Sequence, residues 1–158
     1  IAVMREGRIA QLGEPREIYE APASRYVAEF IGDVNLFEGV VEDPARGVIR
    51  LPGAAVPARA GRALSAAKGE TVAIAIRPEK LIIEKPEDDP PHDENALEGV
   101  IEDIAYLGDM SIYHVRLGDG RIVRVARANR ARLSRQTLVW EDAVRLHWDP
   151  QAVATLAE

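Results

Sequence analysis

From Phe37 onward the sequence consists of short segments rich in Val and Ile, separated by Gly, Pro and Asp at fairly regular spacing. This pattern is typical of a β-barrel or β-sandwich, because each short apolar segment can form one strand and each breaker one turn. The strands expected from it are 37–42, 48–51, 71–77, 81–84, 97–106, 111–117, 121–127 and 143–148. We therefore expect a mainly β fold for most of the chain.

Three of these segments carry further information. Apolar residues alternate with polar ones in 113–117 and in 123–125, and Asp119-Gly120 lies between the two segments. Alternation places the apolar side chains of a strand on one face, and an Asp-Gly pair favours a tight turn, so these segments predict a hairpin. The segment 72–76 is apolar at every position, which predicts an internal strand covered on both faces.

A short internal repeat indicates two related halves. Residues 36–43 resemble residues 96–103, and each copy has a Gly at its fourth position. We interpret the repeat as a duplicated first strand, in which Gly lets the strand bend at a barrel corner. The halves would be 36–85 and 96–158, joined by an acidic, Pro-rich linker at 86–95.

The N-terminal part has a different character. Residues 1–12 read as a hairpin of two short strands, and the apolar opening of the chain suggests that it continues an element of something larger. Pro15 suits the first position of a short helix that Pro22 ends. Ser24 can cap a second helix, which we expect to leave through Gly32 in the left-handed conformation.

The composition excludes several kinds of site and partner. The chain has 158 residues and no Cys, so a disulfide framework, Cys-ligated zinc, an iron–sulfur cluster and a thiol nucleophile are ruled out. The formal net charge of −6 argues mildly against nonspecific binding of nucleic acid or of anionic membrane surfaces. No apolar run approaches the ~18 residues of a membrane span. A Gly-rich phosphate-binding loop is also absent from the sequence.

The residues that could carry chemistry form no known motif. His92, His114 and His147 are too scattered for a local metal motif, and no Gly-x-Ser-x-Gly segment supports a serine nucleophile. We therefore expect no catalytic, cofactor-binding or metal-ligating residue in this chain. A structural role is the expectation for His114.

Charged and aromatic residues leave alternatives open. The acidic run at 84–94 favours a solvated linker, with attraction of polycations as the alternative. Trp140 and Trp148 favour core packing, with an interface as the alternative. A series of arginines could bind nucleic acid, with Tyr113 nearby to stack on a base. A solvated face or a protein contact is favoured, because the arginines fall on both faces of their strands. The series is Arg116, Arg121, Arg124, Arg127, Arg130, Arg132 and Arg135.

Residues 1–32, from Ile-Ala-Val-Met-Arg-Glu-Gly-Arg through Tyr-Val-Ala-Glu-Phe-Ile-Gly, resemble the end of the nucleotide-binding domain of ABC importer ATPases. Arg77-Pro78-Glu79 and the segment 143–148 resemble the regulatory extension of these ATPases, the TOBE domain. Within the family, 104–117 is most similar to the polyamine branch, which imports putrescine and spermidine. The resemblance implies a remnant of the ATPase domain at 1–35 and an OB-like TOBE β-barrel at 36–158.

The resemblance also implies a function. The chain would be the regulatory and dimerisation domain of the ATP-binding subunit of a polyamine importer, at the cytoplasmic face of the bacterial inner membrane. The parent would use ATP and Mg, pair with a second copy, contact permease subunits through the missing ATPase domain, and act indirectly with a periplasmic polyamine-binding protein. Because the family's ATPase motifs lie upstream of Ile1, this piece would be soluble and non-catalytic, without a cofactor of its own, and no nucleic acid is expected as a partner.

Two other functions remain as alternatives. The chain could sense cytosolic polyamine and give feedback inhibition, because a dicationic ligand needs paired carboxylates or aromatic faces. The residues that we assign to such an effector site are Glu102, Asp103, Tyr106 and Asp109. Strand-end solvation and a turn are the simpler interpretation of this group. An OB-type nucleic-acid-binding module is the remaining alternative.

Overall fold

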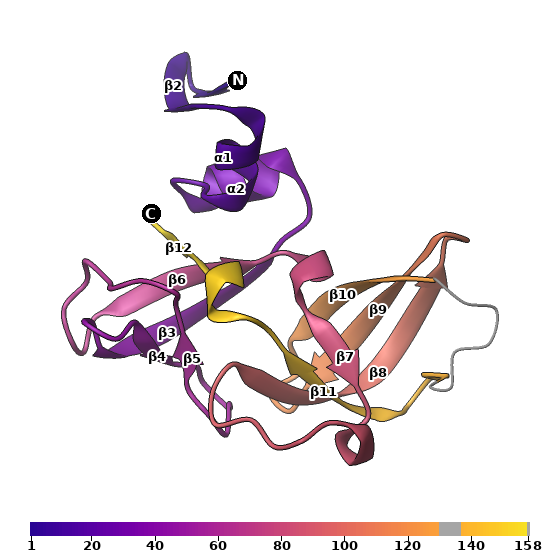
Figure 1. The fold of residues 1–158 in the computed structure, drawn as a ribbon. Coiled ribbons are helices and arrows are strands. Elements are labelled where there is room, and N and C mark those ends of the chain that lie inside the picture. Colours follow the sequence, from indigo (N-terminus) through magenta and orange to yellow (C-terminus); the bar gives the residue numbers. More distant parts are fainter. Residues whose placement is uncertain (130–136, 158) are drawn as a thin grey trace. The chain divides into compact units, whose positions relative to one another are not determined.

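Two five-stranded sheets and a separate two-stranded hairpin make up the β structure of the computed structural model, which describes residues 1–129 and 137–157 (Figure 1). The first sheet has the order β12 (Ala154–Leu156), β6 (Thr71–Ile76), β3 (Asn35–Asp43), β4 (Val48–Arg50) and β5 (Ala58–Arg59). The second sheet has the order β10 (Ile122–Ala128), β9 (Met110–Leu117), β8 (Ala96–Tyr106), β11 (Ala143–His147) and β7 (Ile82–Glu84). The expectation of a mainly β fold is confirmed.

The chain divides into two compact units, each containing one of these sheets. The first unit comprises Ile1–Pro52, Ala58–Arg77 and the residues from Asp149, and the second comprises Gly53–Pro57 and Pro78–Trp148. Every strand expected from the sequence is present, within a few residues of its expected bounds. The short strands β5 and β12 were not predicted, because two or three residues carry too little periodicity.

Both sheets are built in the same way, and they exchange their last strands. Strands β3, β4 and β5 form a meander on which β6 pairs back, just as β8, β9 and β10 form a meander on which β11 pairs back. The strand that follows β6 in sequence, β7, then joins β11, while the strand that follows β11, β12, joins β6. Each exchanged strand is preceded by a 3₁₀ turn that begins with Pro, η1 (Pro78–Lys80) or η3 (Pro150–Ala152).

The internal repeat has a counterpart in the backbone. The pairing of β3 with β4 shifts between Val41 and Asp43, and the pairing of β8 with β9 shifts between Ile101 and Asp103. These are matching positions of the two repeated segments. A β-bulge at each position increases the local twist of the strand, which suits a curled sheet.

The two repeated glycines lie where a neighbouring strand comes close. A Cβ atom on Gly39 would lie 2.8 Å from the carbonyl oxygen of Arg50, and a Cβ atom on Gly99 would lie 2.7 Å from that of Arg116. Such distances leave no room for a side chain. The glycines therefore permit close backbone contact within each curled sheet.

The expected hairpin and internal strand are both confirmed. Strands β9 and β10 pair antiparallel around Gly118-Asp119-Gly120, and Val115 and Val125 from this hairpin are fully buried. Strand β6 lies between β12 and β3, and its Ile74 is also fully buried.

The N-terminal elements are β1 (Ala2–Arg5), β2 (Arg8–Leu12), α1 (Pro15–Glu20) and α2 (Arg25–Ile31). Val3, Ile18 and Val27 form a small core between the hairpin and the helices. Ser24 caps α2 as expected, because its side chain accepts a hydrogen bond from the backbone N–H of Val27 at 3.3 Å.

The expected exit from α2 is wrong. Gly32 has a φ of 169° and a ψ of −179°, which is extended backbone rather than the left-handed conformation. The carbonyl oxygens at this helix end instead accept hydrogen bonds from the side chain of Arg77, which directly follows β6. None of the helices among the described residues is both long enough and apolar enough to cross a membrane.

Candidate functional site

One arginine joins the helical segment to the first sheet. Arg77 directly follows β6 and is only 5% exposed. Its Nη1 atom donates hydrogen bonds to the carbonyl oxygens of Ala28 at 2.9 Å, Gly32 at 2.9 Å and Asp33 at 3.0 Å. Its Nη2 atom donates to the carbonyl oxygen of Tyr19 at 3.3 Å. Because helix C-termini carry partial negative charge, a buried guanidinium is well suited to hold the ends of α1 and α2 together.

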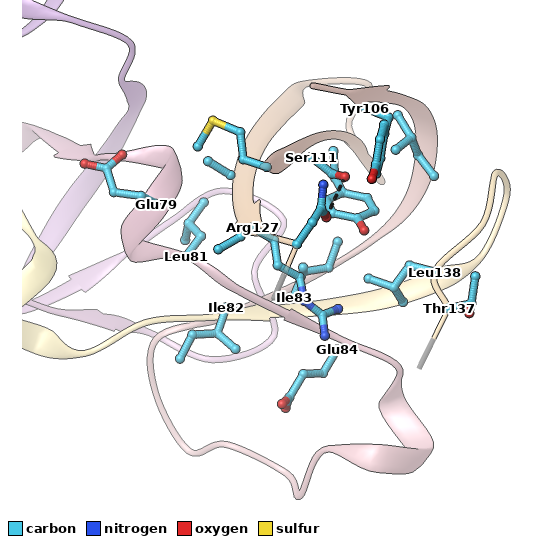
Figure 2. Close-up of a pocket in the computed structure, with 16 residues that line it drawn as sticks. Glu79, Leu81, Ile82, Ile83, Glu84, Tyr106, Ser111, Arg127, Thr137 and Leu138 are labelled. Carbon is cyan, nitrogen blue, oxygen red and sulfur yellow. Dashed lines mark hydrogen bonds between the residues drawn. The ribbon is translucent and has the colours of Figure 1, made fainter. Parts of the chain in front are cut away.

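The second unit contains an open cavity of about 890 Å³ on the inner side of its curled sheet (Figure 2). Apolar and aromatic side chains dominate its wall, with carboxylates at Glu79 and Glu84 and a guanidinium at Arg127. The other lining residues are Leu81, Ile82, Ile83, Ile104, Tyr106, Met110, Ser111, Tyr113, Ala126, Ala128, Asn129, Thr137 and Leu138. An apolar cavity with a few charged groups is the usual form of a small-molecule site.

A hydrogen-bonded group fixes one wall of this cavity. The hydroxyl of Ser111 donates to Oδ1 of Asn129 at 3.0 Å, and Nδ2 of Asn129 donates to the carbonyl of Gly108 at 3.1 Å. Ser111 is 3% exposed, so its hydroxyl is committed to this contact. This hydrogen bond holds the Ser111 side chain in one orientation within the wall.

The four expected effector residues have different local contacts, and only Tyr106 lines the cavity. Tyr106 lines the cavity and is 73% exposed. Glu102 forms an ion pair with Arg116 at 3.4 Å, Asp103 accepts a hydrogen bond from the next backbone N–H at 2.9 Å, and Asp109 lies in the exposed turn before β9. The last three are not part of the cavity wall. Their role in binding an effector stays a prediction.

The arginine series is divided among different environments. Arg116 pairs with Glu102, and Arg121 pairs with Asp119 at 2.6 Å. Arg124 and Arg127 are three residues apart in β10 and so point to opposite faces, with Arg127 at the cavity. Arg130, Arg132 and Arg135 lie outside the described residues. The described arginines therefore do not form one continuous basic surface.

The two tryptophans differ in environment. Trp148 is 4% exposed, as expected for a core residue, but Trp140 is 65% exposed, so its expected place in the core is wrong. Trp140 follows β10 in a connection to β11, where no strand alternation fixes its side chain. Tyr106 and Leu107, at the end of β8, are also exposed apolar residues of the second unit.

The acidic, Pro-rich segment 86–95 is not solvated along its whole length. Asp89 is 5% exposed, and it lies beside His92 and His147. The sequence does not predict this group, because His147 is far from the other two residues in the chain. The only signal was a histidine, His92, three residues after Asp89 in an acidic run, and that signal is too weak to predict a contact with His147.

Comparison with known proteins agrees with this fold. The family profile described as the TOBE domain matches residues 74–156, which is more than half of the chain. The chain belongs to the TOBE domain family. A solved structure of the cytoplasmic molybdate-binding protein ModG has the same fold, with a TM-score of 0.66 over 77% of this chain and 94% of that chain at 16% sequence identity.

Curated relatives of this TOBE-domain chain are ATP-binding proteins of polyamine transport. The putrescine transport ATP-binding protein PotG of Escherichia coli is 40% identical over 158 residues, covering 99% of this chain and 41% of that protein. The spermidine/putrescine import ATP-binding protein PotA of Thermotoga maritima is 36% identical, covering 95% of this chain and 41% of that protein. The chain thus spans about two fifths of the length of these relatives.

Proposed function

We propose that this chain is the regulatory C-terminal part of the ATP-binding subunit of a polyamine importer, with putrescine as the transported substrate. The contacts of Arg77 carry the proposal. The helical segment resembles the end of an ATPase domain, and a single buried side chain ties both of its helices to the TOBE sheet. A movement of the two helices would then be transmitted directly to the TOBE sheet, and a movement of the sheet to the helices.

In this proposal the chain itself does not hydrolyse ATP. The sequence contains no phosphate-binding loop, so ATP and Mg would be bound by the rest of the subunit. The partners would be a second copy of the subunit, the permease subunits and, indirectly, a periplasmic polyamine-binding protein. The subunit would lie at the cytoplasmic face of the inner membrane.

Two exposed surfaces support contacts of this kind. The hairpin packs on the helices through Val3, but Ile9 and Leu12 are 59% and 69% exposed, which suits a sheet that continues in an ATPase domain. Trp140 and Tyr106 expose aromatic surface on the second unit, which suits contact with a second copy. Holding two subunits together would raise the effective concentration of their ATPase domains.

A chimera tests this function. This chain would replace the matching portion of the E. coli putrescine transport ATP-binding protein, and putrescine uptake would be measured in cells lacking the native protein. We expect uptake, and we expect the Arg77→Ala chimera to lose it while the control chimera Arg8→Ala retains it. A chimera that assembles with the permeases and hydrolyses ATP but does not support uptake would contradict the proposal.

A second candidate function rests on the cavity of Figure 2. The faces of Tyr106 and Tyr113 in its wall are groups that bind a cationic polyamine, while the carboxylates of Glu79 and Glu84 lie at its edges, that of Glu84 paired with His147 at 3.3 Å. Calorimetric titration of putrescine and spermidine at physiological salt tests this function. Saturable binding that is weakened in Tyr113→Leu would support a sensor, whereas no heat of binding would leave only the structural regulatory role.

A further inference from the structure

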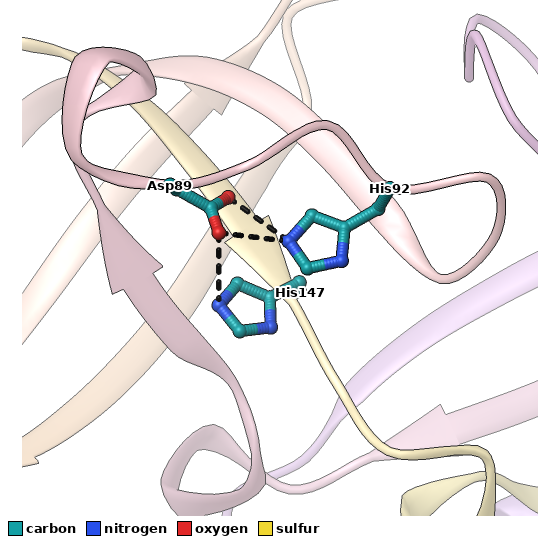
Figure 3. Close-up of side chains that lie close together, drawn as sticks. All are labelled: Asp89, His92 and His147. Atoms are coloured by element: carbon teal, nitrogen blue, oxygen red, sulfur yellow. Dashed lines mark hydrogen bonds and ion pairs between the residues drawn. The ribbon is translucent and has the colours of Figure 1, made fainter.

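Three side chains from two distant parts of the sequence meet in the second unit (Figure 3). Asp89 and His92 belong to the segment after β7, and His147 is the last residue of β11. The Nε2 atom of His92 lies 2.8 Å from Oδ1 of Asp89, and the Nε2 atom of His147 lies 3.7 Å from the same oxygen. Both imidazoles thus direct the same nitrogen toward one carboxylate oxygen, with their ring centroids 4.3 Å apart.

One more carboxylate lies beside this group, on β7. Oε2 of Glu84 lies 3.3 Å from Nε2 of His147, but the donor atoms that all lie within 4.8 Å of one another are those of Asp89, His92 and His147. The side chain of Asp89 is 2% exposed, so water does little to stabilise its charge. A carboxylate at such a buried position needs hydrogen bonds, a proton or a cation to compensate it.

The spacing of these three donors is close to that around a small tetrahedral ion. Zinc bound to imidazole nitrogen and carboxylate oxygen has bond lengths of about 2.0–2.2 Å, which places neighbouring donors roughly 3.3–3.6 Å apart. Nε2 of His92 and Nε2 of His147 lie 2.8 and 3.7 Å from Oδ1 of Asp89, and the three donors all lie within 4.8 Å of one another. The three side chains therefore offer three corners of a tetrahedral site.

The charges around the donors also favour a divalent cation. The guanidinium of Arg145 is shared between Asp89, whose Oδ2 lies 3.4 Å from Nη1, and Glu98, whose Oε1 lies 3.3 Å from Nη2. Among the described residues, the Glu84 carboxylate forms an ion pair with His147 and none with a guanidinium. When the imidazoles are neutral, the local charge is therefore negative, and a divalent cation would offset it.

Arg145 is placed to orient a ligand rather than to displace the ion. Its Nη1 atom donates to the backbone carbonyl of Asp89 at 2.8 Å and lies 3.4 Å from Oδ2 of the same residue. Oδ1 faces both imidazoles, and Nε2 of His92 also lies 3.0 Å from Oδ2. A carboxylate ligand held through its second oxygen is a common arrangement around protein-bound metals.

We propose that Asp89, His92 and His147 bind one Zn²⁺ ion. Two imidazoles and one carboxylate suit zinc better than Mg²⁺ or Ca²⁺, which prefer oxygen donors alone. The fourth position of the tetrahedron is open to water or to the neighbouring Glu84 carboxylate. The ion fastens the segment that contains Asp89 and His92 to strand β11.

The test uses the whole chain without a polyhistidine tag. Zn²⁺ is titrated by calorimetry, with Mg²⁺ as the control, and the Hε1 signals of the three histidines are followed by NMR. We expect saturable binding of one Zn²⁺ per chain, with changes in the signals of His92 and His147 and none in that of His114. Unchanged signals for His92 and His147 would show that the group is only a hydrogen-bonded cluster and would overturn the proposal.

Variants identify the ligands. His92→Ala and His147→Ala should each raise the dissociation constant for Zn²⁺ about tenfold or more, whereas His114→Ala should leave it unchanged. Circular dichroism shows whether each variant is folded, and the NMR measurement on the unaltered chain does not depend on the variants. A loss of affinity in His114→Ala equal to that in His92→Ala would indicate nonspecific binding and would also overturn the proposal.

Discussion

The guanidinium carbon of Arg77 lies 4.3 Å from the centroid of the Tyr19 ring, and Nη2 of Arg77 donates to the Tyr19 carbonyl at 3.3 Å. The same side chain reaches the end of α2, where Gly32 is extended and provides no left-handed cap. A side chain distant in sequence thus takes the place of the usual C-terminal capping motif. The helices consequently depend on the sheet for the completion of their ends.

Removing this side chain should destabilise the first unit. We expect Arg77→Ala to lower the free energy of unfolding by about 3 kcal/mol, because buried carbonyls would lose their donors. Arg77→Lys should recover only part of the loss, since an ammonium group cannot reach Tyr19 and three other carbonyls at once. Urea unfolding measures the free energy of unfolding of both variants. The exposed control Arg8→Ala should change stability by less than about 0.5 kcal/mol, and an equally small effect of Arg77→Ala would contradict the assignment.

The two repeated glycines should respond alike to substitution. A Cβ atom at Gly39 would lie 2.5 Å from Cγ2 of Ile49, and one at Gly99 would lie 2.6 Å from Cγ1 of Val115. Gly39→Ala and Gly99→Ala should therefore each cost about 1–3 kcal/mol, because the neighbouring strand must move. Thermal unfolding checks the prediction. In the matched control Gly118→Ala, the added methyl group meets nothing within 4 Å, and a loss equal to that of Gly99→Ala would refute the steric explanation.

The sequence predicted the features that depend on neighbours in the chain. Alternation of apolar residues located the hairpin around Asp119, and the fully apolar segment 72–76 located the internal strand β6. The repeat around Gly39 and Gly99 indicated two related strands, and the matching bulges agree with it. In each case the deciding interactions lie within one strand or one turn.

Features that depend on distant contacts were not predictable from the sequence. The exchange of β7 and β12 between the sheets depends on pairing, which a strand of three residues does not specify. Gly32 has the residue type of a left-handed cap, but Arg77 makes that cap unnecessary. His92 and His147 meet only because β11 pairs beside β7.

The environments of the two tryptophans can be separated by fluorescence. With Trp140 exposed and Trp148 buried, we expect Trp140→Phe to shift the emission maximum to shorter wavelength, because only the buried indole remains. Stability should change by less than about 0.5 kcal/mol in this variant, whereas Trp148→Ala should cost about 3 kcal/mol. A shift to longer wavelength in Trp140→Phe would show that the assignment of exposure is reversed.

Asp119 should titrate at unusually low pH. The backbone N–H of Arg121 donates to Oδ1 of Asp119 at 3.0 Å, and Nε of the Arg121 side chain donates to Oδ2 at 2.6 Å. These contacts lower the pKa of Asp119 below its usual value of 3.8. Because the pKa is lower in the folded chain than in the unfolded chain, the ionised carboxylate stabilises the hairpin fully above the unfolded value. That stabilisation is lost as the pH falls through the folded pKa.

Carboxyl ¹³C titration by NMR measures the pKa of Asp119 directly. In Arg121→Ala the pKa should rise but remain below 3.8, because the backbone donor, which has the largest effect, is retained. A pKa for Asp119 at or above 3.8 in the unaltered chain would show that the two hydrogen bonds do not form in solution.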